Sequence, residues 1–486
     1  MKTKKYHKMI IDRNRILLLL IGMLLSFSSC NDAKYQNKKE AKTSKPNVII
    51  IFTDDQGYGD LGVYGHPTIK TPNLDRMANE GQKWTNFYVS ANVCTPSRAG
   101  LLTGRYAIRS GMTSNKRWVL FPDSDGGLPT NEITIAEVAK EAGYATAAVG
   151  KWHLGHLPEY LPTNHGFDSY YGIPYSNDMD RLGVVNEKDI AEYFSAFIDP
   201  KIETFNVPLM QNEKIIERPA NQNTITKRYT EEAVKFIVNN KDNPFFLYVA
   251  HSLPHVPLFA SEKFMGTSDR GLYGDVIEEI DWSAGEILKT LKSAGIDKNT
   301  LVVFTSDNGP WAIFGNQGGS AGLLKGAKGT SYEGGVRVPG IFWWPETIMP
   351  NVVSKMGSTL DLLPTIANLL NVELPKDRIY DGYDQTEILK GNETSVRNEM
   401  IYYHNTQVFA ARKGDYKLYF YRNNPNGYPE KLEKLKNLEL FNLAQDPSEK
   451  RNIMGEHPNV VKEINDLIEK HNSGLKLVKN QLETRI

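Results

Sequence analysis

The sequence predicts an α/β protein with a large doubly wound, mixed and mostly parallel sheet flanked by helices, and a smaller C-terminal antiparallel sheet plus helix. Apolar, β-branched runs without alternation indicate strands that are buried on both faces, as in parallel sheets. Helical segments separate these runs, which is typical of a doubly wound sheet. From about residue 399 the pattern changes to alternating strands. The 486 residues also exceed what one small core accommodates.

The predicted elements of the large sheet follow one another along the chain. The expected buried strands are residues 47–52, 145–150, 245–250 and 301–306. The expected helices are residues 72–78, 96–103, 135–140, 230–239, 275–294 and 360–370. Residues 315–335 are rich in glycine and too irregular for regular structure, so we expect an active-site loop there.

The C-terminal part is predicted to form a separate subdomain. Strands are expected at 406–411, 416–421 and 438–443, followed by a helix at 459–471. The expected division is a catalytic domain at 47–398 and a C-terminal subdomain at 399–486.

The first thirty residues are typical of a targeting segment. A lysine- and arginine-rich start precedes an apolar run at 16–27, which is shorter than the roughly 20 residues that span a bilayer. Ser28-Ser29-Cys30 resembles the cleavage box of bacterial lipoproteins, although Phe27 stands where leucine is usual. We expect lipidation at Cys30; the alternative is ordinary signal cleavage that discards it. Residues 31–46 are a polar linker.

The predicted targeting segment implies that the protein is exported. We expect it in the periplasm or anchored to the outer membrane as a lipoprotein. The lipoprotein-like start, the few cysteines and the lysine- and asparagine-rich composition favour a Gram-negative bacterium. Membrane contact is expected only through the lipid anchor.

Composition excludes some classes of protein. The formal net charge is +0 and the pI about 7.2, which gives no support for a nucleic-acid partner. Only two cysteines occur, so a disulfide framework is not expected.

Oxygen-bearing side chains follow two of the predicted strands. Asp54 and Asp55 come after 47–52, and Asp307 and Asn308 after 301–306. Functional groups collect at the carboxyl ends of strands in such sheets. An all-oxygen ligand set favours Ca²⁺ first and Mg²⁺ second. The alternative for each pair is a turn or a helix cap.

Cys94 begins the segment Cys94-Thr95-Pro96-Ser97-Arg98, which continues as Ala-Gly-Leu-Leu-Thr-Gly-Arg. Pro96 and Ser97 favour a helix start, and Gly104 can end the helix. A thiol at a helix N-terminus beside Arg98 is biased toward the thiolate; the alternative is a small buried apolar side chain.

This segment resembles the signature of the type I sulfatases, which belong to the alkaline phosphatase superfamily, and the resemblance extends over about 46–452. It implies that Cys94 is oxidised to formylglycine by a formylglycine-generating or sulfatase-maturating enzyme. The hydrated aldehyde would then attack sulfur. Residue 94 would be a further metal ligand beside the four oxygen-bearing side chains.

The resemblance also implies roles for other residues. Arg98 would steady the hydrated aldehyde. Lys151 and Lys328 would hold the sulfate oxygens, the latter within a segment, 326–337, that is similar to the family's second signature. His153 would release sulfate from the nucleophile.

Three further assignments concern the leaving group and the substrate. His251 would be the acid for the leaving group, with His255 structural or at the pocket rim. Ser176 matches a substrate contact of the arylsulfatase branch. Trp311 and Tyr332 suit stacking on a sugar and core packing equally.

The sequence therefore predicts a sulfatase that acts on a sulfated polysaccharide or oligosaccharide. The nearest alternative is a formylglycine-dependent phosphonate monoester or phosphodiester hydrolase. Two others are a glycan-binding lipoprotein with an inactive site, and a cysteine hydrolase that pairs Cys94 with His153 or His251.

Overall fold

The computed structural model describes residues 45–182, 196–392, 396–428, 431–476 and 478–486. The predicted leader at 1–30, including Cys30, and residues 31–44 of the predicted linker lie outside the described residues. Residues Pro46–Ile486 form one compact unit. Within the described part, no helix combines the length and the apolar character needed to cross a bilayer.

The large sheet has ten strands in the order β10-β2-β9-β8-β1-β7-β3-β4-β5-β6. Pairing is parallel from β8 through β1, β7 and β3 to β4, whereas β9 runs antiparallel to both β8 and β2. This mixed sheet confirms the predicted fold class. Its strands are β1 (Asn47–Thr53), β2 (Gln82–Tyr88), β3 (Ala145–Gly150), β4 (Ser169–Gly172), β5 (Leu209–Gln211), β6 (Lys214–Glu217), β7 (Phe245–Ala250), β8 (Thr300–Ser306), β9 (Arg337–Trp343) and β10 (Asn351–Ser358).

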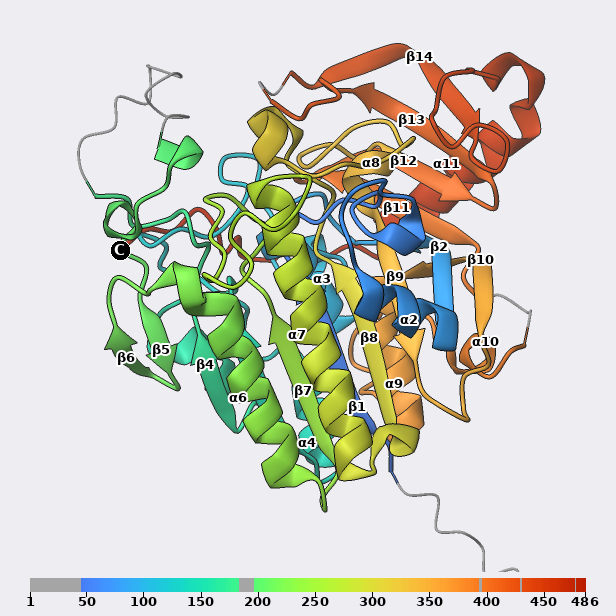
Figure 1. Ribbon diagram of the computed structural model, residues 1–486. Coiled ribbons are helices and arrows are strands. Elements are labelled where there is room, and N and C mark those ends of the chain that lie inside the picture. Colours follow the sequence, from blue (N-terminus) through green and yellow to red (C-terminus); the bar gives the residue numbers. More distant parts are fainter. Residues whose placement is uncertain (1–44, 183–195, 393–395, 429–430, 477) are drawn as a thin grey trace, which may run out of the picture. The chain divides into compact units, whose positions relative to one another are not determined.

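Helices cover both faces of this sheet, as the doubly wound prediction requires. The β1 side chains alternate: Ile49 and Ile51 join the core under one helical layer, and Val48 and Ile50 join the opposite core. The first layer, in front of the sheet in Figure 1, contains α2 (Pro72–Glu80), α6 (Ile225–Asn240) and α7 (Leu272–Ala294). The other contains α3 (Cys94–Thr103), α4 (Ile135–Glu141) and α9 (Leu362–Leu370).

The four predicted buried strands are β1, β3, β7 and β8, within one residue at each end. The sequence does not predict the other six strands of this sheet, β2, β4, β5, β6, β9 and β10. Strand β2 mixes polar and apolar residues, so its local sequence does not indicate a strand. Its hydrogen-bonded pairing with β9 and β10 stabilises the extended conformation instead. The segment expected to be irregular, 315–335, is mostly loop and ends in the short α8 (Glu333–Val336).

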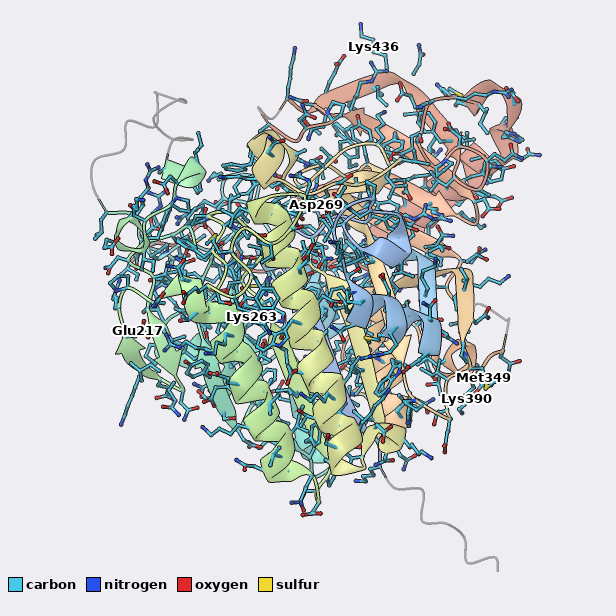
Figure 2. All side chains as sticks on the ribbon, in the orientation of Figure 1. Glu217, Lys263, Asp269, Met349, Lys390 and Lys436 are labelled. Carbon is cyan, nitrogen blue, oxygen red and sulfur yellow. The ribbon has the colours of Figure 1, made fainter. Side chains whose placement is uncertain are left out.

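A second, antiparallel sheet follows the short helix α10 (Thr386–Leu389). It comprises β11 (Glu399–His404), β12 (Gln407–Lys413), β13 (Tyr416–Arg422) and β14 (Glu433–Asn442), of which β11 was not predicted. Helix α11 (Pro458–Ser473) packs on it through Ile464, against Ala411 and Leu418. Charged side chains such as Lys436 on β14 project outward (Figure 2). The division at 398/399 stays a prediction, because both sheets belong to one compact unit.

Candidate active site

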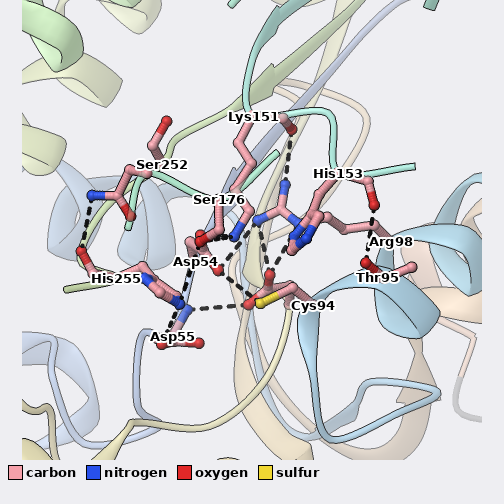
Figure 3. A network of polar contacts seen from close by, with 12 residues as sticks. Asp54, Asp55, Cys94, Thr95, Arg98, Lys151, His153, Ser176, Ser252 and His255 are labelled. Atoms are coloured by element: carbon pink, nitrogen blue, oxygen red, sulfur yellow. Dashed lines mark hydrogen bonds and ion pairs between the residues drawn. The ribbon is translucent and has the colours of Figure 1, made fainter. Parts of the chain in front are cut away.

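The ends of β1 and β8 bring the predicted metal ligands together. The two strands are parallel neighbours with Thr53 paired to Ser306, so the residues that follow them leave the sheet side by side. One carboxylate oxygen each from Asp54, Asp55 and Asp307, together with the Cys94 sulfur, lie within 4.8 Å of one another. Figure 3 shows Cys94 facing Asp54 and Asp55. The spacing along the sequence therefore becomes one buried cluster.

Asn308 completes the oxygen set. Its Nδ2 donates to Asp55 Oδ1 at 2.7 Å. Its buried Oδ1 has no hydrogen-bond partner among the described residues, and a buried polar atom left unpaired calls for a partner of another kind. Carboxylate and amide oxygens are the ligands that hard divalent cations prefer. The four side chains thus fit a metal ion.

Three basic groups contact these carboxylates. Lys328 Nζ donates to Asp55 Oδ2 at 2.8 Å. Lys151 Nζ forms an ion pair with Asp54 and donates to Ser176 Oγ at 3.1 Å.

Arg98 is the third basic group. Its Nη2 lies 2.8 Å from Asp307 Oδ2 and 3.5 Å from Asp54 Oδ1. Another nitrogen of the guanidinium, Nη1, donates to the carbonyl of Lys151 at 3.0 Å. Arg98 therefore holds the carboxylates in place.

The carboxyl groups differ in their pKa. Burial raises the pKa of Asp307 to about 7, with repulsion from Asp54 adding to it and Arg98 opposing. Burial likewise raises the pKa of Asp55 to about 6, against the attraction of Lys328. Burial also disfavours the charge on Asp54, but Lys151, His255 and Arg98 together hold the pKa of Asp54 well below its usual range. A cation bound between Asp54, Asp55 and Asp307 would relieve the repulsion among their carboxylates.

Cys94 is the first residue of α3, and Gly104 ends this helix with φ +64°, as predicted. The Cys94 Sγ donates to Asp54 Oδ1 at 3.4 Å. Burial raises the pKa of the thiol well above its ordinary value, and the Asp54 carboxylate raises it further. The expected bias toward a thiolate is therefore wrong for the unmodified cysteine, because burial and Asp54 outweigh the helix N-terminus and nearby cations.

His153 lies beyond β3 with φ +58°. Its Nε2 lies 2.9 Å from the carbonyl oxygen of Leu120, which places the ring proton on Nε2. Its Nδ1 is buried without a partner in the described chain. Burial lowers the pKa of this imidazole well below its ordinary value, and Lys151 lowers it further. His153 is thus neutral, with a free lone pair on Nδ1.

Of the two histidines that follow β7, His251 lies outside the cavity where the acid was expected, whereas His255, expected to be structural or at the pocket rim, lines it. His251 packs toward α7, where its Nε2 lies 3.4 Å from Ser283 Oγ, and it does not line the cavity that contains Cys94. His255 does line this cavity, with Nε2 3.5 Å from Ser176 Oγ and 3.6 Å from Asp55 Oδ2. The backbone N–H of His251 donates to the carbonyl of Phe52 on β1 at 2.8 Å, so this residue continues the strand pairing of β7. Residue type and spacing alone do not separate the two.

A cavity of about 500 Å³ opens beside Cys94. Ser176, Lys328 and Trp311 line it as anticipated, whereas Tyr332 is buried in the core and donates to the carbonyl of Asn423. Sequence reasoning missed most of the other lining residues, which come from separate loops: Lys116, Arg117, Trp118, Phe121, Asp178, Tyr428 and Arg485.

Comparison with known proteins gives matches over both parts of the chain. Residues 46–372 match the family model described as Sulfatase, and residues 395–485 match that described as the C-terminal region of aryl-sulfatase.

Individual relatives agree. Human arylsulfatase A is 38% identical over 460 residues, covering 91% of this chain and 89% of the relative. N-acetylgalactosamine-6-sulfatase of Mus musculus is 41% identical over 389 residues, covering 77% and 72% respectively. Among solved structures, Ps i-CgsB in complex with k-i-k-neocarrahexaose is 30% identical with a TM-score of 0.75, covering 90% of this chain and 95% of that one.

Proposed function

Because this chain belongs to the sulfatase family and is a sulfuric ester hydrolase, we propose that it acts on sulfate esters of a sulfated polysaccharide or oligosaccharide. The proposed reaction uses formylglycine made from Cys94 and a bound Ca²⁺. The observation that carries the proposal is the position of Cys94 within the cluster of Asp54, Asp55 and Asp307.

The metal is proposed from the donor set. Asp54, Asp55, Asp307 and Asn308 would hold it, and their oxygens favour Ca²⁺ over Mg²⁺ where the coordination number exceeds six. When bound, a divalent cation would supply positive charge beside the nucleophile and the sulfuryl oxygens.

Formylglycine at position 94 would supply, through its hydrated aldehyde, a nucleophilic oxygen in place of a thiol. Its formation requires a formylglycine-generating or sulfatase-maturating enzyme as a partner. The Cys94 thiol donates to Asp54 rather than to a histidine, which argues against the cysteine-hydrolase alternative.

The surrounding residues have distinct tasks in this proposal. The ammonium groups of Lys151 and Lys328 bind sulfuryl oxygens and stabilise the negative charge that develops on them. His153 accepts a proton at its unpartnered Nδ1.

In this proposal His255 takes the acid role that the resemblance implies for His251. Its Nδ1 contacts the carbonyl of Val256, so Nε2 is the atom that faces the cavity. Protonated Nε2 would donate to the leaving oxygen, and an anionic sulfate ester in the cavity favours that protonation.

A glycan substrate is supported by the relatives. One is named an N-acetylgalactosamine-6-sulfatase, and one solved neighbour contains an oligosaccharide. The cavity is large enough for a saccharide unit, and it carries aromatic side chains together with a carboxylate.

Turnover of an aryl sulfate and of an aryl phosphodiester by one purified sample tests the reaction class. We expect a large preference for the sulfate ester, because the cationic site is matched to a sulfuryl group. A preference for the phosphodiester would instead establish the phosphonate or phosphodiester hydrolase.

Mass spectrometry of the peptide that spans Cys94 tests the modification. We expect formylglycine in protein from the native host and loss of turnover in Cys94→Ala. A wholly unconverted thiol, with binding of glycan but no turnover, would favour a binding protein.

We also propose export, with lipidation at Cys30, on the pattern of residues 1–30. Labelling with palmitate in the native host tests it. The label should be absent from Cys30→Ala, and an unlabelled wild-type protein would contradict it.

A further inference from the structure

Residues 478–486 pack along the loop 111–126, which forms one wall of the active-site cavity. The backbone N–H of Gln481 donates to Gly111 O at 2.9 Å, and that of Asp125 donates to Thr484 O at 3.0 Å. Ser124 and Arg485 form an antiparallel bridge. The wall therefore depends on a segment more than 350 residues away in the sequence.

Two glycines allow this close approach. A Cβ on Gly111 would lie 2.1 Å from Lys479 O, and one on Gly126 would lie 2.0 Å from Gln481 O. Leu482 is fully buried in the main core. The segment is thus fixed at its middle, so the position of Arg485 is defined.

Fixing the segment places basic groups at the mouth of the cavity. Arg485 lines it together with Lys116 and Arg117. Arg117 forms an ion pair with Asp123, whose other oxygen lies 3.6 Å from Arg485 Nε.

Asp123 thus forms ion pairs with the guanidinium groups of both Arg117 and Arg485. The buried Nη1 of Arg117 has no hydrogen-bond partner in the described chain. Lys116 forms an ion pair with Glu483, with 3.0 Å between Nζ and Oε2. Lys116, Arg117 and Arg485 against Asp123 and Glu483 leave one positive charge in excess among these five side chains, and Asp178 is the acidic residue among those that line the cavity.

Aromatic rings connect this mouth to the reaction centre. Trp118 lies 5.1 Å from Tyr428, and Tyr428 lies 5.8 Å from Trp311, between ring centroids. Trp311 in turn lies 4.0 Å from Lys328 Nζ. Sugar rings pack on such surfaces, so a saccharide whose sulfate reaches Lys328 can extend along them toward Arg117.

We propose that Arg485 and Arg117 form a second anion-binding subsite, which selects sulfated saccharides that carry a further carboxylate or sulfate. This inference rests on the proposed function and specifies its substrate class. Guanidinium groups suit both kinds of anion, through paired N–H donors. A neighbouring sulfate ester or a uronate in the same glycan would supply this second anion.

The test measures inhibition of 4-nitrophenyl sulfate hydrolysis by three disaccharides. One carries a single sulfate, one carries two sulfates, and one carries a sulfate and a uronate. We expect the wild-type enzyme to bind the two doubly charged compounds more tightly than the singly charged one. The better of these two inhibitors identifies which anion the subsite prefers.

Arg485→Gln should raise Ki for the doubly charged compounds by up to about 5-fold, since Arg485 is 66% exposed and exposed pairs contribute little. Its effects on Ki for the singly charged compound and on kcat/KM for the aryl sulfate should be smaller, because neither compound carries a second anion to place at Arg485. Arg485→Lys should retain part of the preference. Arg451→Gln, which replaces an exposed arginine that does not line the cavity, is the matched control and should change nothing.

Equal Ki values for singly and doubly charged compounds in the wild type would overturn the inference, as would an unchanged preference in Arg485→Gln. Absence of aryl sulfate hydrolysis by the wild type would instead refute the proposed function. Calorimetric Kd values for the same disaccharides would then still decide the inference.

Discussion

At the scale of single residues, the site balances three buried carboxylates against three buried basic groups. Arg98, Lys151 and Lys328 each contact at least one of Asp54, Asp55 and Asp307. Removing one member leaves an opposite charge buried without its partner, which costs several kcal/mol. The same groups therefore determine both local stability and the affinity for an anion.

Chelation tests the metal directly. Treatment with EDTA should lower kcat, because the cluster regains its repulsion and the sulfate loses a positive neighbour, and Ca²⁺ should restore activity more fully than Mg²⁺. Initial rates after dialysis and titration with each ion measure this. The Asn308→Ala enzyme should need more Ca²⁺ for half-maximal rate, and full activity in metal-free buffer would exclude the metal.

The two histidines after β7 should behave differently when replaced. His255→Ala should lower kcat by about 10²–10⁴-fold, the range for loss of a general acid, because it removes the imidazole that faces Ser176 and Asp55. His251→Ala should chiefly lower the free energy of unfolding, because this side chain is buried outside the cavity. Steady-state kinetics and urea unfolding of both variants separate the effects; the reverse pattern would restore His251 as the acid.

At the scale of elements, α4 is defined by a capping box. Thr134 Oγ1 accepts from the N–H of Glu137, whose carboxylate accepts from the N–H of Thr134. The same hydroxyl donates to the carbonyl of His165 at 2.9 Å. The cap thus joins α4 to the loop that follows β3. This loop contains both His153 and His165.

Loss of this cap should be measurable. Thr134→Ala should reduce the free energy of unfolding by about 1–2 kcal/mol, because a backbone N–H loses its acceptor. Urea unfolding curves measure the change. Thr134→Ser keeps the oxygen and should lose less; equal losses would mean that the methyl group, and not the cap, stabilises the helix.

The ring of His165 makes this region sensitive to acid. Burial lowers the pKa of His165 to about 4, and neither ring nitrogen has a partner within the described residues. The unfolded chain binds a proton near pH 6.5, so stability is complete above that pH and is lost as the pH falls toward 4.

Replacement of this histidine should reduce the loss. The contribution amounts to about 3 kcal/mol for one group with this shift. His165→Leu should therefore lose less stability between pH 6.5 and 4 than the wild type, in unfolding curves measured at each pH. Part of the loss should remain, because burial also lowers the pKa of His251 and His471 to about 4. Parallel pH profiles would show that His165 is not responsible.

At the scale of the whole molecule, a buried ion pair joins the small sheet to α8, the short helix that precedes β9 of the large sheet. Lys417 on β13 donates to Glu333 Oε1 at 2.8 Å, and Glu333 begins α8 at the end of the glycine-rich loop. Although burial disfavours its charge, Lys417 and Arg337 hold the pKa of Glu333 at about 2. The small sheet thereby supports the loop that carries Lys328.

Breaking this pair should destabilise the molecule as a unit. Lys417→Met should reduce the free energy of unfolding by about 3–5 kcal/mol, because Glu333 loses the nearer of its two cations in the core and keeps Arg337 at 3.4 Å. Lys436→Met, on the exposed face of β14, should stay within about 0.5 kcal/mol of the wild type. Urea unfolding measures both, and similar effects would show that the pair contributes little.

The sequence determined the fold class, the four central strands and the residues of the metal-type cluster. These predictions depend on local pattern: apolar runs define buried strands, and parallel strands deliver the residues at their ends to one edge. The Cys94 segment is likewise contiguous, and its resemblance identified the family that the comparisons show.

Only the tertiary structure decided which of His251 and His255 faces the cavity, how burial sets the protonation of Cys94, and which loops form the substrate wall. Each depends on contacts between segments far apart along the chain. Strand β2 needs β9 and β10 as partners, and Arg485 reaches the cavity only because residues 478–486 pack against Gly111 and Gly126. The local sequence pattern does not indicate such contacts, because they stabilise the protein only once distant segments of the chain have packed together.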